Sequence, residues 1–164
     1  MEKQEFKIFC HNLFLKYGFT KVKKTYYLKC KDMLCGICLN HSMAQAYYVD
    51  LLFFVGEYND KKTYPTISSS DMSRCFTVPS KCRDNTGKYF MDGCIEYGRY
   101  TKEEIEPYFV DTLEKYVVPL ITEGKKYVLE NQDFYLKAVF EHEMDTVLNK
   151  LRNTNQTIRG RYYD

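Results

Sequence analysis

Two neighbouring runs of the chain alternate between apolar and other residues. In the first run, Met33, Cys35, Ile37 and Leu39 share one side of an extended strand. In the second run, the residues on one side are Tyr47, Val49, Leu51, Phe53 and Val55. Period-two apolar sets joined by a short connection are typical of a hairpin. The pattern therefore predicts an antiparallel β-hairpin lying over a core.

Helical spacing comes before this hairpin, and further strands flank it. Apolar residues from Phe6 to Tyr17 recur at three- and four-residue intervals, which predicts a helix that Gly18 ends. Three more strands are predicted, at Thr25–Cys30, at Arg74–Val78 with Pro79 as its stop, and at Tyr89–Tyr97. The polar residues 80–88 between the last two are predicted to be irregular.

The last third of the chain is predicted to be helical. Thr101 with Glu104 three residues later resembles a capping box. Pro107 lies too deep for a first turn, so it is expected to start a new helix or to kink this one. A last helix is predicted from about Asp133 to about Arg152, because apolar residues such as Leu136, Phe140 and Met144 recur there at four-residue spacing. The fold class is therefore α+β: an N-terminal helix, an antiparallel sheet of four to five strands and two to three C-terminal helices.

The length and composition of the chain narrow its domain number, partners and location, but they do not indicate a function. The 164 residues, 45% of them hydrophobic, predict one domain over 1–152 and a mobile tail over 153–164. The net charge of +2 does not by itself indicate a polyanionic partner. The N-terminus lacks the pattern of a signal peptide, and no run approaches the ~18 apolar residues of a spanning helix. We therefore expect a cytoplasmic protein without a membrane partner, with reduced cysteines.

Several short sequence motifs resemble those of a known family. They are Tyr17-Gly18-Phe19, Thr25-Tyr26-Tyr27, the Ile37…Ser42…Val49-Asp50-Leu51 hairpin and Tyr116-Val117-Val118-Pro119-Leu120. Together with the order of elements they resemble Domain of Unknown Function family 4304, a family of uncharacterised bacterial proteins. His41 and Asp50 depart from the residues expected there. The resemblance implies a fold and no activity.

The sequence contains only weak candidates for metal-binding or catalytic motifs. Cys30, Cys35, Cys38 and His41 offer a C-x4-C-x2-C-x2-H set of zinc ligands. Cys35 and Cys38 lie three apart in a strand, however, so they are expected to point to opposite faces. A redox role of the same pair would need a helix N-terminus, which the strand pattern does not provide. We therefore predict no metal, no cofactor and no catalytic residue, although an enzyme of unknown class stays an alternative.

A basic segment supports a nucleic-acid hypothesis. The first 31 residues hold eight lysines and two acids, and lysines alternate with aromatic residues over Lys21–Lys29. Lys21, Lys23, Lys24, Tyr26 and Tyr27 are the residues that would bind single-stranded nucleic acid by charge and stacking. The alternative interpretation is an edge strand that lysines protect against wrong pairing.

The opposite side of the hairpin is also rich in apolar residues. It carries Leu34, Cys38, Tyr48, Leu52 and Phe54. Either the C-terminal helices cover this face, which is the expected arrangement, or the face meets a partner. In the second case Tyr48, Leu52 and Phe54 would bind another protein. A non-enzymatic protein-binding module of the inhibitor or immunity-like kind is therefore the favoured hypothesis.

Overall fold

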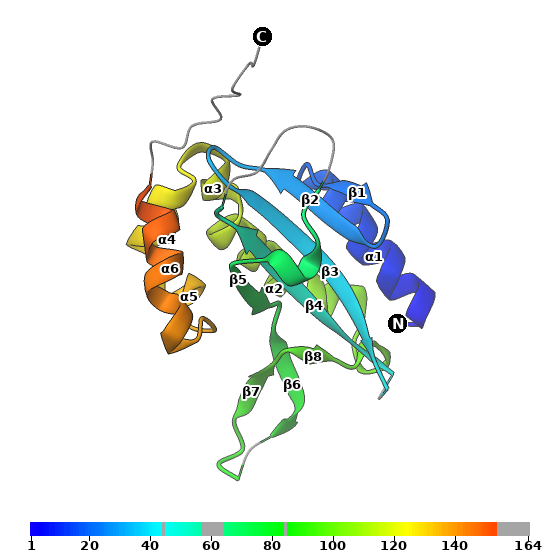
Figure 1. Cartoon of the computed structure of the whole chain (residues 1–164). Coiled ribbons are helices and arrows are strands. Elements are labelled where there is room, and N and C mark those ends of the chain that lie inside the picture. The colour runs from blue at the N-terminus through cyan, green and yellow to red at the C-terminus, as the bar shows by residue number, and fades with distance from the viewer. Residues whose placement is uncertain (44, 57–63, 84, 154–164) are drawn as a thin grey trace.

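A six-stranded antiparallel sheet forms the centre of the computed structural model, which describes residues 1–43, 45–56, 64–83 and 85–153. The strands are β1 (Thr20–Val22), β2 (Thr25–Lys29), β3 (Leu34–Ser42), β4 (Ala46–Phe54), β5 (Met72–Cys75) and β8 (Cys94–Ile95). Strands β1 to β5 follow one another across the sheet (Figure 1). Strand β8 pairs with the first half of β4, and β5 pairs with its second half. The predicted hairpin is confirmed: β3 and β4 pair from Leu34 opposite Phe54 to Ser42 opposite Ala46.

A separate two-stranded hairpin projects from this sheet. It consists of β6 (Val78–Arg83) and β7 (Tyr89–Asp92) (Figure 1). The prediction that residues 80–88 are irregular is therefore wrong for the first of them. Pro79 does not stop a strand but lies within β6 opposite Met91. Proline is tolerated there because this hairpin has only edge strands.

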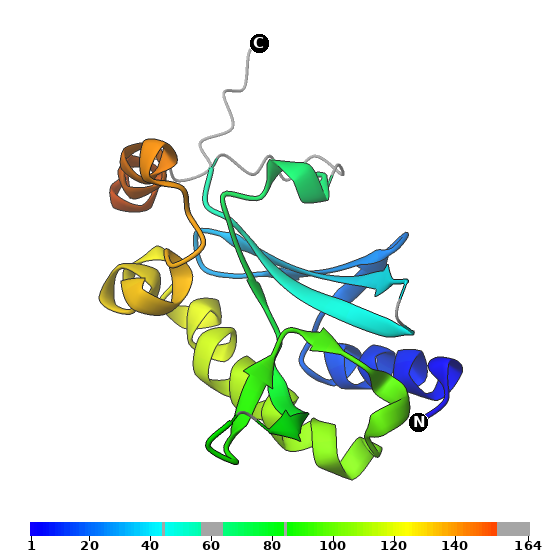
Figure 2. The ribbon, with the colours of Figure 1, turned by 90° about the horizontal axis from the view of Figure 1, so that it is seen from below.

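Two long helices cover one face of the six-stranded sheet. Figure 2 shows α1 (Lys3–Lys16) and α2 (Lys102–Tyr116) below the sheet, with the 3-10 helix η1 (Ile67–Ser69) above it. A second 3-10 helix, η2 (Tyr97–Arg99), leads into α2. The aromatic rings of Phe6, Phe9, Phe76 and Phe109 meet between the helices and the sheet. The main hydrophobic core thus lies on the face that carries Cys35, Ile37, Val49 and Leu51.

Within the described residues, four shorter helices follow α2 and lie beside the β5 edge of the sheet. They are α3 (Val118–Thr122), α4 (Lys125–Glu130), α5 (Gln132–Tyr135) and α6 (Glu141–Arg152) (Figure 1). The single helix predicted from Asp133 to Arg152 is therefore wrong, because the chain leaves the helical path between α5 and α6. A turn with a hydrogen bond from Val139 N to Leu136 O replaces it. Of the predicted mobile tail, only Asn153 lies within the described residues.

The start of α2 confirms the capping box. Thr101 Oγ1 accepts a hydrogen bond from Glu104 N, and Glu104 Oε2 accepts one from Thr101 N. Pro107 does not start a new helix, since α2 runs through it from Lys102 to Tyr116. Within the described ranges, none of the helices is long and apolar enough to cross a membrane.

The capping box predicts a small, pH-dependent contribution to stability. Thr101→Ala should lower the free energy of unfolding by about 1 kcal/mol, because the backbone N–H of Glu104 loses its partner, the Thr101 hydroxyl. The hydrogen bonds from Lys81 and from Thr101 N lower the pKa of Glu104. Its contribution is therefore present above the ordinary carboxyl pKa and disappears as the pH falls through the lowered one. Urea unfolding at several pH values checks both points.

Glu104→Gln is the matched variant for the pH effect. We expect it to flatten the acid limb of the stability profile, whereas Glu143→Gln on α6 should leave that limb unchanged. Equal profiles for wild type and Glu104→Gln would contradict this account of the helix start.

Candidate functional site

The sheet face that points away from α1 and α2 divides into a covered half and an open half. The covered half is apolar and consists of Tyr27, Leu34, Leu52 and Phe54, with Cys38 at its border. Tyr64 stacks on the Tyr27 ring with a centroid distance of 4.6 Å, and Tyr27 Oη donates to Pro65 O at 2.6 Å. The segment before η1 therefore covers these side chains.

This arrangement corrects the expectation that the C-terminal helices cover the second face. In Figure 2 the 3-10 helix η1 lies above that face, while α1 and α2 lie below the sheet and the later helices lie at its side. The physical reason is that α3–α6 follow α2 along the β5 edge of the sheet and pack beside it. The cover is instead a stretch of the connection between β4 and β5.

The open half of the face carries polar groups and thiols in two rows. We refer to these residues as the open face: Cys38, Asn40, Tyr48, Asp50, Cys75 and Cys94. Strand register places them, since Cys38, Asp50 and Cys75 are opposite one another across β3, β4 and β5. Asn40, Tyr48 and Cys94 form the next row, across β3, β4 and β8. Residues of one row on adjacent strands lie within contact distance.

A hydrogen-bonded network fixes the first row. Asp50 Oδ1 accepts from Cys75 Sγ at 3.1 Å, and Asp50 Oδ2 accepts from Asn40 Nδ2 at 2.5 Å. Asn40 Oδ1 in turn accepts from Cys38 Sγ at 3.3 Å. Each carboxylate oxygen of Asp50 therefore accepts a hydrogen bond, so the carboxylate is not left without a partner. The network forms an ordered polar floor beneath the open face.

Tyr48 stands on this floor as an exposed aromatic side chain. It is 43% exposed, and it shares a hydrogen bond with Cys94 that raises the pKa of Tyr48. A tyrosine whose hydroxyl is held on one side presents a large, ordered surface at low entropic cost. The side chain is therefore suited to be the central contact of an interface.

Two thiols of the open face, Cys38 and Cys75, are poor nucleophiles. Burial, the hydrogen bond to Asp50 and the charge of Asp50 raise the pKa of Cys75 to about 12. Burial and the charge of Asp50 also raise the pKa of Cys38, which Lys24 and the hydrogen bond to Asn40 only partly oppose. Because the thiolate is the reactive form, this chemistry favours contact over covalent catalysis.

The basic residues predicted for nucleic-acid binding are only partly available. Lys21, Lys23 and Lys24 are exposed along the edge strand β1 and the turn that follows it. Tyr26 and Tyr27 are buried on opposite faces of the sheet, so neither offers a free ring for stacking. The structure therefore separates the charges of this hypothesis from its stacking groups.

The predicted protein-binding residues do not form one exposed surface either. Tyr48 is exposed, whereas Leu52 and Phe54 are 3% and 4% exposed beneath Tyr27 and Tyr64. The sequence did not indicate the polar partners Asn40, Asp50, Cys75 and Cys94. Asn40 and Asp50 meet through the register of β3 with β4. Cys75 and Cys94 join them through the register of β4 with β5 and β8, which no local pattern specifies.

The cysteine motif is divided as the strand pattern predicted. Cys35 lies in the main core, and Cys38 lies on the opposite face. The His41 ring packs against Tyr47 with a centroid distance of 5.0 Å. Across the described residues, no three His, Cys, Asp or Glu side chains are grouped so as to hold a metal ion.

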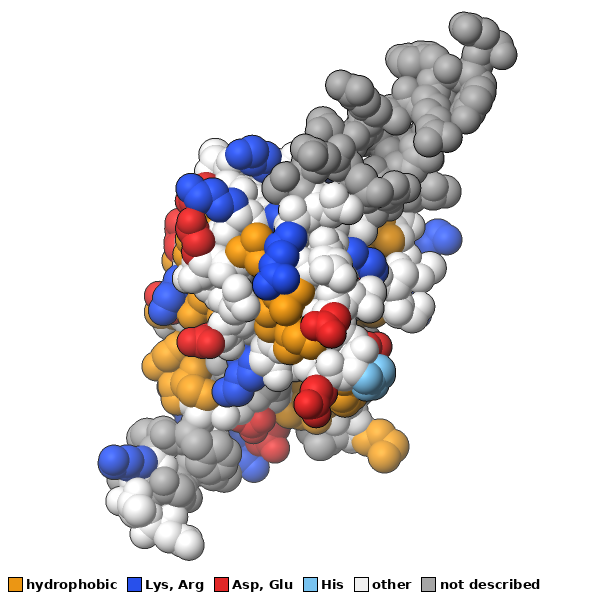
Figure 3. All heavy atoms as spheres, turned by 60° about the vertical axis from the view of Figure 1, so that its left-hand side comes forward, with side chains coloured by type: hydrophobic (Ala, Val, Ile, Leu, Met, Phe, Trp, Pro, Cys, Tyr) orange, Lys and Arg blue, Asp and Glu red, His pale blue; other side chains and the backbone are white. Residues whose placement is uncertain are grey.

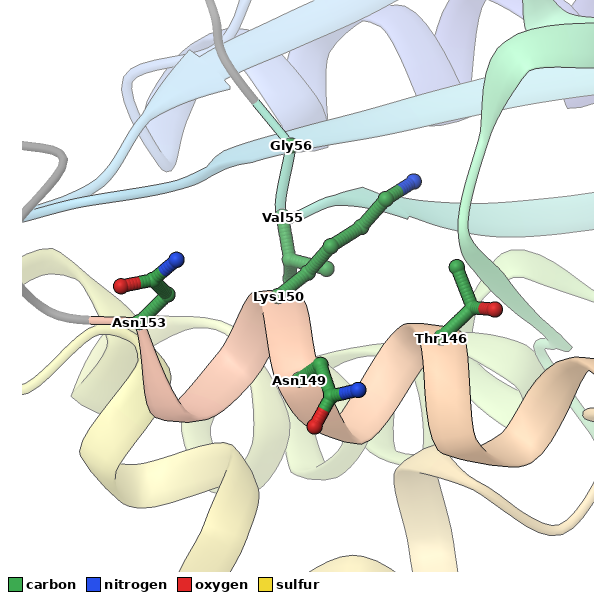
Figure 4. Close-up of a pocket in the computed structure, with 6 residues that line it drawn as sticks. All are labelled: Val55, Gly56, Thr146, Asn149, Lys150 and Asn153. Atoms are coloured by element: carbon green, nitrogen blue, oxygen red, sulfur yellow. The ribbon is translucent and has the colours of Figure 1, made fainter.

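A small cavity lies between the end of β4 and α6 (Figure 4). Its volume is about 260 Å³, and its lining comprises Val55, Gly56, Thr146, Asn149, Lys150 and Asn153. Lys150, the charged residue of this lining, donates to Asp71 Oδ1 and is thereby neutralised. The cavity therefore has few polar groups that are free to bind a ligand.

Two other surfaces are of mixed character. A groove of about 670 Å³ between α1 and α2 has an apolar floor that includes Ile8 and Phe9, and both acids and lysines at its rim. On the side of the molecule that carries α4–α6, basic and acidic side chains surround apolar atoms (Figure 3). Neither surface favours a partner of one charge, in contrast to the lysines near the open face.

Comparison with protein-family models, with curated proteins and with solved structures found no match. The resemblance to Domain of Unknown Function family 4304 therefore stays a prediction.

Proposed function

We propose that this protein is a non-enzymatic module that binds an acidic surface of another protein through the open face. The observation that supports the proposal most is Tyr48, an exposed aromatic residue on a hydrogen-bonded polar floor. Buried or half-buried contacts around one exposed tyrosine are typical of protein-binding hot spots. An inhibitor or immunity-like role, in which the module blocks its partner, fits this arrangement.

The sign of the partner's charge is inferred from the basic N-terminal part of the chain and from Lys24, which belongs to it and lies near the open face. By contrast, Lys3, Lys7 and Lys16 lie on α1 behind the sheet. Residues 1–31 carry eight lysines and two acids, a net +6, so the rest of the chain carries −4 of the total +2. Lys24 lies close enough to influence the Cys38 thiol on the open face. A dipolar charge distribution of this kind steers an acidic partner and orients it on the basic end.

Binding of single-stranded nucleic acid is the second candidate. The exposed Lys21, Lys23 and Lys24 favour it, since phosphates would meet the same charges. The burial of Tyr26 and Tyr27 counts against it, because stacking supplies about 1–3 kcal/mol per base in such complexes. We therefore favour a protein partner over single-stranded nucleic acid, and photocrosslinking with nuclease treatment distinguishes these two kinds of partner.

Site-specific photocrosslinking tests the proposal. A photoreactive p-benzoylphenylalanine replaces Tyr48 in one variant and Tyr108 in another, because these two residues have similar exposure, 43% and 39%. Both variants are irradiated in extract of the native host. We expect one discrete protein adduct at position 48 that nuclease does not remove, and no such adduct at position 108 on α2.

The lysines provide the control. Lys23→Glu with Lys24→Glu should abolish the adduct at position 48, whereas Lys126→Glu on α4 should leave it intact. A nuclease-sensitive adduct would support the nucleic-acid candidate instead. Equal adducts at positions 48 and 108, or none at 48, would contradict the proposal.

A further inference from the structure

Two thiols on the core side of the sheet lie in direct contact. The Sγ atoms of Cys30 and Cys35 are 3.6 Å apart. Cys30 follows β2, and Cys35 in β3 pairs with Leu28, so the two side chains are diagonal neighbours on one face. A disulfide bond is about 2.05 Å long, so small side-chain rotations would bring these sulfurs to bonding distance. Sequence reasoning considered Cys35 with Cys38, which lies on the other face.

We propose that Cys30 and Cys35 form an oxidisable dithiol that a hydroperoxide converts into a disulfide. This inference is independent of the proposed function, because neither residue belongs to the open face. It rests on the contact between the sulfurs and on their different exposure.

The two thiols differ in their access to an oxidant. Cys30 is half-buried, whereas Cys35 is fully buried and burial raises its pKa. Cys30 therefore meets the peroxide first. Its sulfur attacks one peroxide oxygen, the O–O bond breaks, and Cys30 becomes a sulfenic acid while the other oxygen leaves as water from hydrogen peroxide or as an alcohol from an organic hydroperoxide.

Closure of the disulfide completes the reaction. Cys35 attacks the Cys30 sulfur, the S–S bond forms, the S–O bond breaks, and the departing hydroxide takes the Cys35 proton as water. Overall the two thiols lose two electrons and two protons to one hydroperoxide. The fixed contact between the sulfurs offsets the low thiolate content of Cys35.

The disulfide would close at the turn on which the C-terminal helices rest. Within this turn Cys30 N donates to Met33 O, and Lys31 N donates to Leu120 O of α3. Asp32 Oδ1 accepts from Lys125 N at 2.7 Å. Gly124 lies so close that an added Cβ would overlap Asp32 Oδ1. Oxidation would therefore fix the connection between the sheet and α3–α4, with no contact to the open face.

Mass spectrometry of the native protein after treatment with hydrogen peroxide tests the inference. We expect the intact mass to fall by two hydrogens and to return with dithiothreitol. Trypsin without reduction should then release residues 30–31 linked to residues 32–61. This link should be absent in Cys30→Ala and in Cys35→Ala and present in Cys38→Ala.

Trapping of the intermediate distinguishes the order of steps. In Cys35→Ala, dimedone should label a sulfenic acid at Cys30. Cys30→Ala keeps the test valid if Cys35→Ala fails to fold, because Cys30 is half-buried and its loss leaves the core intact. A link that persists in Cys35→Ala, an intact-mass loss of two hydrogens that persists in Cys30→Ala, or oxygen addition without any link would overturn the inference.

Discussion

Phe109→Ala should lower the free energy of unfolding by about 3–5 kcal/mol, as expected for a buried phenylalanine. Phe109 is fully buried on α2, and its ring centroid lies 4.7 Å from that of Phe76 and 5.6 Å from that of Phe9. It also meets the edge of Phe6. The truncation would leave a cavity at the place where α1, α2 and the segment after β5 meet.

Urea unfolding followed by circular dichroism measures this effect. Tyr108→Ala is the control, because Tyr108 is the neighbouring residue of the same helix and is 39% exposed. Its variant should stay within about 0.5 kcal/mol of wild type. Equal losses for Phe109→Ala and Tyr108→Ala would contradict the assigned core face of α2.

Asp71→Ala should be the second strongly destabilising change, with an expected loss of about 2–3 kcal/mol. The carboxylate is largely buried and accepts from Val55 N at 2.8 Å and from Gly56 N at 3.3 Å. It also binds Lys150 Nζ of α6. Asp71 therefore joins the end of β4 to the last described helix, and its loss leaves two backbone donors without these partners.

A double-mutant cycle apportions this effect. Lys150→Met removes the ion pair but keeps both backbone hydrogen bonds, so it should cost less than Asp71→Ala. The double variant should then resemble Asp71→Ala alone. Equal destabilisation by Lys150→Met and Asp71→Ala would contradict this account. It would mean that the ion pair, and not the two backbone hydrogen bonds, makes the main contribution of Asp71 to the free energy of unfolding.

Sequence patterns predicted the parts of the fold whose side chains repeat with a regular period. The β3–β4 hairpin, α1 and the capped start of α2 each bury a periodic set of residues, such as Phe6 and Leu13 on α1. Short elements gave no such signal. The strands β1 and β8 have three and two residues, too few for a period to be visible.

Proline and spacing misled the prediction in two places. Pro79 suggested the end of a strand, yet it occupies β6 in an isolated hairpin, where its missing N–H costs little. The four-residue spacing of Leu136, Phe140 and Met144 suggested one helix. In the structure Leu136 is buried and Phe140 is 67% exposed, because the chain turns between them. Tertiary packing overrides spacing there.

The candidate site was less accessible to prediction than the fold. Tyr48 was identified from the alternation of β4, and Asp50 lies two residues further along the same strand, but Cys75 and Cys94 join them only through pairing of β4 with β5 and β8. Cys75 and Cys94 are distant from β4 in sequence, so spacing could not group them. The cover over Leu52 and Phe54 comes from the connection between β4 and β5, which has no periodic pattern.

The most direct test of the proposed function is the affinity of purified variants for the protein that crosslinks at position 48. Tyr48→Ala should weaken binding by about tenfold or more, because a central tyrosine contributes over ~1 kcal/mol in most interfaces. Lys23→Glu with Lys24→Glu should slow association, and the affinity of wild type should fall as salt rises. Tyr108→Ala should bind as wild type does. Equal affinities for wild type and Tyr48→Ala, at any salt concentration, would contradict the account.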